Sequence, residues 1–307
     1  MIETVISQAS GNWIWLDIIN PTKKDLNQLA QKYGLHNNLV KDCLDPEHLP
    51  KYERYADVHF LILRSFDENC NQEADEVVEL TRKIAIFFSD SFLITIHRKE
   101  QSFLTKIKND LKEKQSEVSQ QNSMIYIVAE ILEQVAHTYE KPIDNAFLEL
   151  EKIEHKTIKL DALDSDVLQK GYYIKRRATV FKRMFRMSVD VLNRVNFLLG
   201  DEQKSKGQDI KENIENLFFY VDQLLDDTNN LLNLHISISS QRTNEVMRLL
   251  TIFSLFFLPL NFIASIYGMN FEFMPELKWE FGYYTVLAFM CLIALLILLW
   301  FKRKKWL

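Results

Sequence analysis

The chain has 307 residues and a formal net charge of −5 at pH 7. Four cationic residues, Lys302 to Lys305, lie near its end, so residues 1–301 alone carry a charge of −9. This acidic balance argues against nucleic acid as a partner and is compatible with cation binding. The histidines and cysteines show neither H-x-x-x-H nor C-x-x-C spacing, and no nucleophile and base pattern indicates an enzyme.

Residues 1–120 predict a cytosolic α/β domain. No basic region followed by an apolar run begins the chain, so we expect no cleaved signal peptide. Short β-rich and amphipathic segments alternate, and the polar residues 89–91 predict a hairpin between the last two strands. The expected strands are 13–18, 58–63, 82–88 and 92–96, and the expected helices are 20–33 and 101–114.

Residues 121–248 predict a stalk of long helices. Apolar residues recur at helical spacing from Ile127 to Ile153, which predicts one helix bent by Pro142. A second helix is expected from about Ser165 to Leu199. A third starts near Asp209 and meets no breaker before Pro259, so we expect it to continue into a membrane. A helix of about 50 residues is ~75 Å long and can transmit movement.

Two apolar stretches predict membrane spans at 249–267 and 281–301, joined by a polar loop at 268–280. Each uncharged stretch is close to the ~20 residues that cross a bilayer as a helix. The basic tail, 302–307, predicts a cytoplasmic C-terminus, and two spans then place the N-terminus on the same side. We therefore expect a multi-pass protein of the plasma or inner membrane. The simplest alternative is a pair of plain anchors.

Polar residues gather on one face of the first predicted span. At 100° per residue, Thr251, Ser254, Asn261 and Ser265 fall within an arc of roughly 80°. A hydroxyl stripe can join helices in lipid, but an amide that faces lipid is costly. The stripe therefore predicts a water-filled pore. The second span has no such stripe and is expected to face lipid.

The C-terminal part of the chain contains several short motifs in a fixed order: Asn244-Glu245-Val246-Met247, Pro259, Tyr267-Gly268-Met269-Asn270-Phe271, Met274-Pro275-Glu276-Leu277 and Lys304-Lys305-Trp306-Leu307. In order and spacing these motifs resemble the CorA family of magnesium channels and transporters. Upstream, residues 42–44 and 50–53 are similar to the family with a looser fit.

The resemblance implies a funnel-shaped homopentamer whose first spans line a pore. Gly268, Met269 and Asn270 would form the selectivity ring, with the Asn270 amide and the Gly268 carbonyl facing the ion. Two departures stand out, because Asn261 replaces a Thr common in relatives and Asn233 stands where some relatives have an acid. A simpler interpretation is that Gly268 ends the helix and Asn270 caps the loop. The implied pore lining is Asn244, Met247, Leu250, Ser254, Leu258, Asn261 and Ser265.

The resemblance also implies regulatory metal sites at acids between subunits. Spacing matches Asp209 to one of these acids, and Asp67 to the other if a short gap is allowed, with Glu68 as its rival. In the loop, Glu272 and Glu276 would raise the cation concentration at the pore mouth. The alternative for these loop acids is a solvated surface.

These features predict a passive Mg²⁺ influx channel, driven by the membrane potential and gated by intracellular Mg²⁺. Co²⁺ and Ni²⁺ are further candidate ions, and no organic cofactor is expected. One alternative is a Zn²⁺ transporter of the ZntB type, against which the Met-Pro-Glu-Leu loop argues. The other is a membrane-anchored oligomeric sensor without transport, against which the polar stripe argues.

Overall fold

The computed structural model describes residues 2–6, 13–113, 124–158, 165–270 and 274–304. The chain divides into two compact units, residues 1–232 and residues 233–307. Helix α8 (Lys204–Tyr267) contributes residues to both units.

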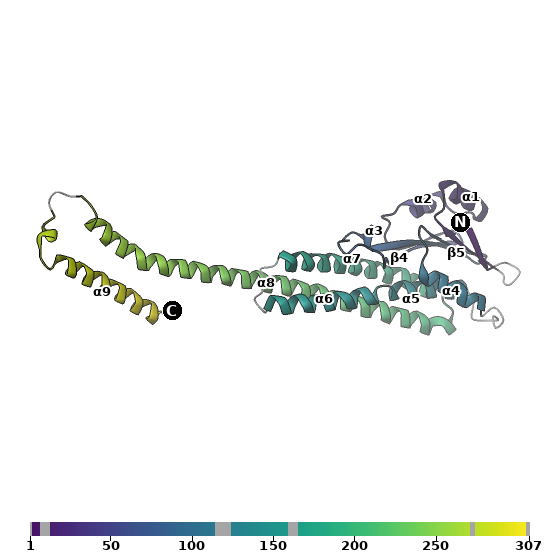
Figure 1. Cartoon of the computed structure of the whole chain (residues 1–307). Coiled ribbons are helices and arrows are strands. Elements are labelled where there is room, and N and C mark those ends of the chain that lie inside the picture. The colour runs from purple at the N-terminus through teal and green to yellow at the C-terminus, as the bar shows by residue number, and fades with distance from the viewer. Residues whose placement is uncertain (1, 7–12, 114–123, 159–164, 271–273, 305–307) are drawn as a thin grey trace. The chain divides into compact units, whose positions relative to one another are not determined.

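A β-sheet forms the framework of the first unit (Figure 1). It has six strands in the order β1-β2-β6-β5-β4-β3. Strands β2 and β6 are parallel, and the other neighbouring pairs are antiparallel. The predicted strands and the hairpin between the last two are confirmed. The strands are β1 (Ile2–Ile6), β2 (Ile14–Ile19), β3 (Lys51–Tyr55), β4 (Val58–Phe66), β5 (Thr81–Ser89) and β6 (Phe92–His97).

Helices cover both faces of this sheet. Because successive side chains of a strand point to opposite faces, β4 divides its residues between two cores. Phe60 and Ile62 pack with α1 (Lys23–Tyr33) and α2 (Asn37–Leu44). Leu61 and Leu63 join the larger core, which contains residues of α4 (Ser102–Glu113), α5 (Met124–His137), α6 (Glu140–Ile158), α7 (Ser165–Asn196) and the first part of α8. One apolar core therefore joins the sheet to the long helices.

Local chemistry sets the ends of α1. The Asp25 amide donates to the Thr22 hydroxyl at 3.2 Å, and the Thr22 amide donates to the Asp25 carboxylate at 2.8 Å. This reciprocal capping box satisfies amides that the first turn leaves without partners. At the other end Gly34 has φ of 66°, a left-handed conformation that glycine adopts without strain. The predicted helix up to Tyr33 is confirmed.

The long helices differ from the prediction at four ends. The expected single helix from Ile127 to Ile153 is wrong, because α5 ends at His137 and α6 begins at Glu140. At the break, the Thr138 hydroxyl accepts from the Phe66 amide at 2.9 Å and the Tyr139 hydroxyl donates to the Arg64 carbonyl at 2.8 Å. Pro142 lies in the first turn of α6, where its missing amide costs little. Helix α7 ends at Asn196 rather than Leu199, and α8 begins at Lys204 rather than near Asp209.

Two short helices complete the first unit. Helix α3 (Val77–Leu80) precedes β5, and the 3-10 helix η2 (Asp201–Gln203) precedes α8. The cysteines Cys43, Cys70 and Cys291 are all free.

The second unit contains the two apolar helices. The C-terminal part of α8 and α9 (Gly282–Arg303) are each long and apolar enough to cross a membrane, by length and composition. The connection between them includes the 3-10 helix η3 (Pro275–Lys278). Pro259 lies inside α8 without ending it, as the sequence predicted. Helix α9 runs back in the direction opposite to α8 (Figure 1).

A buried polar network ties the sheet to α4. The Asp17 carboxylate accepts from the Thr95 hydroxyl at 2.6 Å, from His97 Nε2 at 2.9 Å and from the Lys108 ammonium at 2.8 Å. The Trp15 indole donates in turn to Thr95 at 3.1 Å. Burial alone would raise the pKa of Asp17, but hydrogen bonds from His97, Lys108 and Thr95 lower it from 3.8 to about 2.

We predict that Asp17→Asn destabilises the first unit. The substitution leaves the buried Lys108 ammonium without one of its two carboxylates, a change that costs about 3 kcal/mol at neutral pH. Because folding lowers the pKa of Asp17, its stabilisation is complete above pH 4 and is lost as the pH falls toward 2. Thermal unfolding of the purified chain should show a lower midpoint for the variant at pH 7, and a smaller difference from wild type below pH 4.

Asp57→Asn is the matched control, because the Asp57 side chain is 99% exposed and lies 4.0 Å from Arg54. It should leave the midpoint unchanged. Equal midpoints for the Asp17 variant and wild type at pH 7 would contradict the prediction.

Candidate functional site

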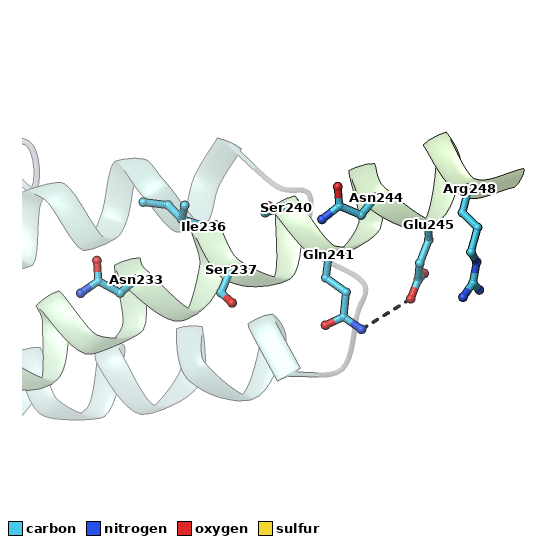
Figure 2. Close-up of a pocket in the computed structure, with 8 residues that line it drawn as sticks. All are labelled: Asn233, Ile236, Ser237, Ser240, Gln241, Asn244, Glu245 and Arg248. Atoms are coloured by element: carbon cyan, nitrogen blue, oxygen red, sulfur yellow. Dashed lines mark hydrogen bonds between the residues drawn. The ribbon is translucent and has the colours of Figure 1, made fainter. Parts of the chain in front are cut away.

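Helix α8 carries a polar face at the start of the second unit (Figure 2). Asn233, Ser237, Ser240 and Asn244 follow one another at three- or four-residue steps, the spacing of one helix face. They line an open groove with Ile236, Gln241, Glu245 and Arg248. The Gln241 amide donates to the Glu245 carboxylate over a long 3.5 Å. The groove therefore offers hydroxyl and amide groups to a ligand or to another chain.

Sequence reasoning placed Asn244 on this face and singled out Asn233 only through the family resemblance, and it missed Ser237, Ser240 and Gln241. The signal was available, because the 100° step that related the polar residues of the first span also extends toward the N-terminus. On an ideal helix, Ser237 and Ser240 fall within about 40° of Asn244. The polar face is therefore longer than the predicted span.

All the residues predicted to line a pore are exposed in the single chain. The polar face upstream is exposed as well. Several of the predicted pore-lining residues are large apolar side chains, such as Met247, which is 56% exposed, and Leu258, which is 69% exposed. The exposed set is Asn244, Met247, Leu250, Ser254, Leu258, Asn261 and Ser265.

The half-buried residues of the same span lie on its other side. They are centred roughly 170° from the predicted pore lining, at 100° per residue. Near its end, α8 approaches α9, because Ala264 and Tyr267 of α8 line one cavity with Val286, Leu287 and Met290 of α9. The half-buried set in α8 is Ile252, Phe256, Pro259, Leu260 and Ile263.

Helix α9 has a matching stripe of half-buried residues. They recur at three- and four-residue steps, the spacing of one helix face. The remaining apolar side chains of α9 are largely exposed, including Leu295 and Leu299 at 55% each. The stripe consists of Val286, Met290, Ile293, Ala294 and Ile297. Among the residues that the structure describes, the second unit therefore leaves one face of α8 uncovered.

The Gly-Met-Asn sequence follows the last residue of α8. The Gly268 amide donates to the carbonyls of Ala264 at 3.0 Å and Ser265 at 3.2 Å, and the Met269 amide donates to Ile266 at 3.3 Å. Among the described glycines, Gly34 alone has positive φ, so Gly268 does not end α8 as a left-handed residue. A Cβ at Gly268 would lie 3.3 Å from the Ala264 carbonyl, a tight contact. Asn270 is exposed.

The predicted loop acids are only partly described. Glu272 lies outside the described residues. Glu276 belongs to η3, but its side chain is also outside the described part of the structure.

The two predicted regulatory acids have different surroundings. Asp209 is exposed on α8. Asp67 is buried, and its carboxylate lies 2.6 Å from the Arg82 guanidinium and accepts from the Asn69 amide at 2.9 Å. Burial raises the pKa of Asp67, but the Arg82 and Asn69 hydrogen bonds outweigh it and lower the pKa below its usual range. Among the described residues, no three His, Cys, Asp or Glu side chains form a metal cluster within the chain.

Known proteins match this chain over almost its whole length. The family model described as CorA-like Mg²⁺ transporter protein matches residues 10–303. A cobalt/magnesium transport protein CorA from Thermotoga maritima is 28% identical over 324 aligned positions, which cover 100% of this chain and 87% of the relative.

Solved structures show the same fold. The complete structure of the CorA magnesium transporter from Methanocaldococcus jannaschii matches with a TM-score of 0.81 at 21% identity, covering 98% of this chain and 94% of that one. The ZntB cytoplasmic domain from Vibrio parahaemolyticus matches with a TM-score of 0.54 at 16% identity, covering 74% and 88%. The predicted architecture of an N-terminal α/β domain, a long helix and two apolar C-terminal helices is confirmed.

We predict that the exposed face of α8 is wet in a membrane. In a chain whose three cysteines are replaced by serine, Ser254→Cys and Asn261→Cys should react with a hydrophilic thiol reagent. Leu260→Cys, on the half-buried face, should react at least tenfold more slowly, because the thiolate that reacts needs water. The rates can be measured by mass spectrometry on the protein in liposomes. Equal rates at all three positions would contradict the assignment of the wet face.

Proposed function

Because the chain belongs to the CorA-like Mg²⁺ transporter family, we propose that it carries Mg²⁺ across a membrane along the exposed face of α8. The observation that supports this path most directly is the separation of the two faces of α8. One face is half-buried and α8 approaches α9 near its end, whereas Ser254, Asn261 and Ser265 on the other face are exposed among the described residues. Several copies that turn these faces inward would enclose a polar path.

The cost of exposing Asn261 to lipid favours this arrangement. The Thr251 hydroxyl donates to the Met247 carbonyl at 2.8 Å, so its own helix satisfies it. The Asn261 amide makes no side-chain hydrogen bond with any described residue. Placing such an amide in hydrocarbon costs about 2 kcal/mol or more, and this cost disappears if the amide faces water or a hydrated ion. We propose a homopentamer, in which five copies of Asn261 share the path.

The outer end of the path suits a hydrated magnesium ion. Mg²⁺ prefers six oxygen ligands at about 2.0–2.1 Å and gives up its waters reluctantly. In the proposed ring, Asn270 amides and Gly268 carbonyls accept hydrogen bonds from those waters, and Met269 supports the turn. Neutral acceptors bind weakly enough for the ion to leave. Glu272 and Glu276 would add negative charge near the mouth.

The membrane potential supplies the driving force in this proposal. A divalent ion that crosses 100 mV gains about 4.6 kcal/mol, twice the value for one charge. Influx then needs no nucleotide and no organic cofactor. The proposed orientation places both termini in the cytoplasm of a plasma or inner membrane, because the basic tail favours that side. Co²⁺ and Ni²⁺ share the charge and the octahedral hydration of Mg²⁺ and are further candidate substrates.

Intracellular Mg²⁺ is the proposed gating ligand. Asp209 is exposed on α8, where a metal can bridge it to a second subunit. Asp67 is a weaker candidate, because the Arg82 guanidinium already occupies its carboxylate at 2.6 Å. A metal at Asp67 must compete with this ion pair.

We predict that Asn270→Ala abolishes Mg²⁺ influx while the assembly stays intact. The substitution removes the amide oxygens that would accept hydrogen bonds from the waters of the hydrated ion. Influx into proteoliposomes with an imposed inside-negative potential should fall at least tenfold, and size-exclusion chromatography with light scattering should give an unchanged mass.

Asn109→Ala, on the exposed surface of α4, is the matched control and should transport as wild type. Unchanged influx in the Asn270 variant would rule out the selectivity ring. Zinc flux driven by a proton gradient, with no magnesium flux, would favour a transporter of the ZntB type. No flux of any divalent ion would favour a membrane-anchored sensor.

A second prediction concerns gating through Asp209. Asp209→Ala removes a proposed bridging ligand, so influx should continue at an internal Mg²⁺ concentration that stops the wild type. The concentration for half-closure should rise severalfold in proteoliposomes loaded with graded Mg²⁺. Asp57→Ala, which removes another exposed carboxylate, should leave it unchanged. Half-closure at the wild-type concentration in the Asp209 variant would exclude Asp209 as a gating ligand.

A further inference from the structure

A separate cavity lies in the first unit, at one end of the central strands of the sheet. Strands β4 and β6 end at this cavity and β5 begins there, because β5 is antiparallel to both. The end of α2 and the following loop complete its wall. The cavity has a volume of about 370 Å³.

Positive charge dominates the lining of this cavity. Five cationic side chains and one carboxylate line the cavity, although the whole chain has a formal net charge of −5. The charged lining residues are Arg64, Arg82, Lys83, Arg98, Lys99 and Asp67. A concentration of one charge sign in a recess with low-dielectric walls favours a ligand of the opposite sign.

Neutral groups hold three of these cations in place. Arg64 donates to the carbonyls of Pro46 at 2.9 Å and His48 at 2.7 Å, and Arg98 donates to that of Leu44 at 2.8 Å. Lys83 donates to the Asp42 carbonyl at 2.7 Å. Carbonyl groups fix positions without cancelling charge. Burial lowers the pKa of Lys83 to about 8, as expected for an ammonium that lacks sufficient negative charge around it.

Two buried donors on the cavity wall have no partner among the described residues. They are Arg82 Nε and Gln101 Nε2. Gln101 is 4% exposed, and its Oε1 accepts from the Ser65 hydroxyl at 3.0 Å, which fixes the direction of the amide. Each unpaired buried donor costs about 1–3 kcal/mol, and a ligand oxygen at this wall would remove that cost.

We propose that this cavity binds a small organic phosphate of mononucleotide size. Its volume lies near the lower end of the roughly 300–1,000 Å³ typical of small-molecule sites. A phosphate dianion suits an excess of guanidinium and ammonium groups, and its oxygens accept from forked arginine donors. The organic part would contact the apolar section of the wall, formed by Pro21, Leu44, Pro46, Val78 and Ile96.

The Asp67 carboxylate is the group that such a ligand would displace from Arg82. Its carboxylate lies 2.6 Å from Arg82, the residue whose Nε is also unpaired. A phosphate that binds Arg82 competes with Asp67 for the same guanidinium. Occupation of the cavity would therefore weaken this ion pair.

The test is calorimetric titration of the purified full-length protein in detergent, without divalent cations, with AMP as the probe. AMP should bind saturably, one molecule per chain, and at least tenfold more tightly than adenosine or inorganic phosphate. Lys99→Glu reverses an exposed charge at the cavity and should weaken AMP binding at least tenfold. Gln101→Glu keeps the shape of the side chain but replaces the unpaired donor with a carboxylate, and should have a similar effect.

Lys106→Glu is the matched control, because Lys106 is exposed on α4 and does not line the cavity. It should bind AMP as wild type does. Thermal unfolding of each variant separates a loss of binding from a loss of fold. Lack of AMP binding at millimolar concentration, or wild-type affinity in Lys99→Glu, would overturn the proposal. Equal affinity for AMP and inorganic phosphate would overturn the assignment of an organic ligand.

Discussion

The rest of the structure depends on one helix that changes its burial along its length. The first part of α8 (Lys204–Tyr267) is packed in the core, with Ile210, Ile214 and Val221 each at most 1% exposed. Beyond Asn233 the same helix exposes apolar side chains, such as Phe253 at 61%. Backbone hydrogen bonds join neighbouring turns of α8, so no loop separates its buried part from its exposed part.

Local chemistry explains why much of the fold could be predicted from the sequence. The ends of α1 are fixed by Thr22, Asp25 and Gly34, which act within a few residues of one another. The hairpin of β5 and β6 follows from two β-rich runs around a short polar turn. The break between α5 and α6 could not be predicted in this way, because Tyr139 bonds to Arg64, which is 75 residues away in sequence.

The candidate site was predictable to the same extent. Periodicity identified the face of α8 that carries Ser254 and Asn261, because it depends only on the step between residues. Periodicity could not show that α8 approaches α9 near its end, nor that Asp67 is paired with Arg82. The basic cavity was also missed, since its cations come from β4, β5 and the segment after β6 and gather only when the sheet forms.

Pro259 has a mechanical consequence for α8. A proline has no amide hydrogen, so the carbonyl of Leu255 lacks the donor that every neighbouring turn supplies. The series of backbone hydrogen bonds along α8 therefore lacks one bond within the apolar segment. A helix bends most easily at a point where such a hydrogen bond is missing. The residues from Asn261 to Ser265 lie beyond this point, between Pro259 and the end of α8, so a bend at Pro259 would change their direction relative to the preceding turns.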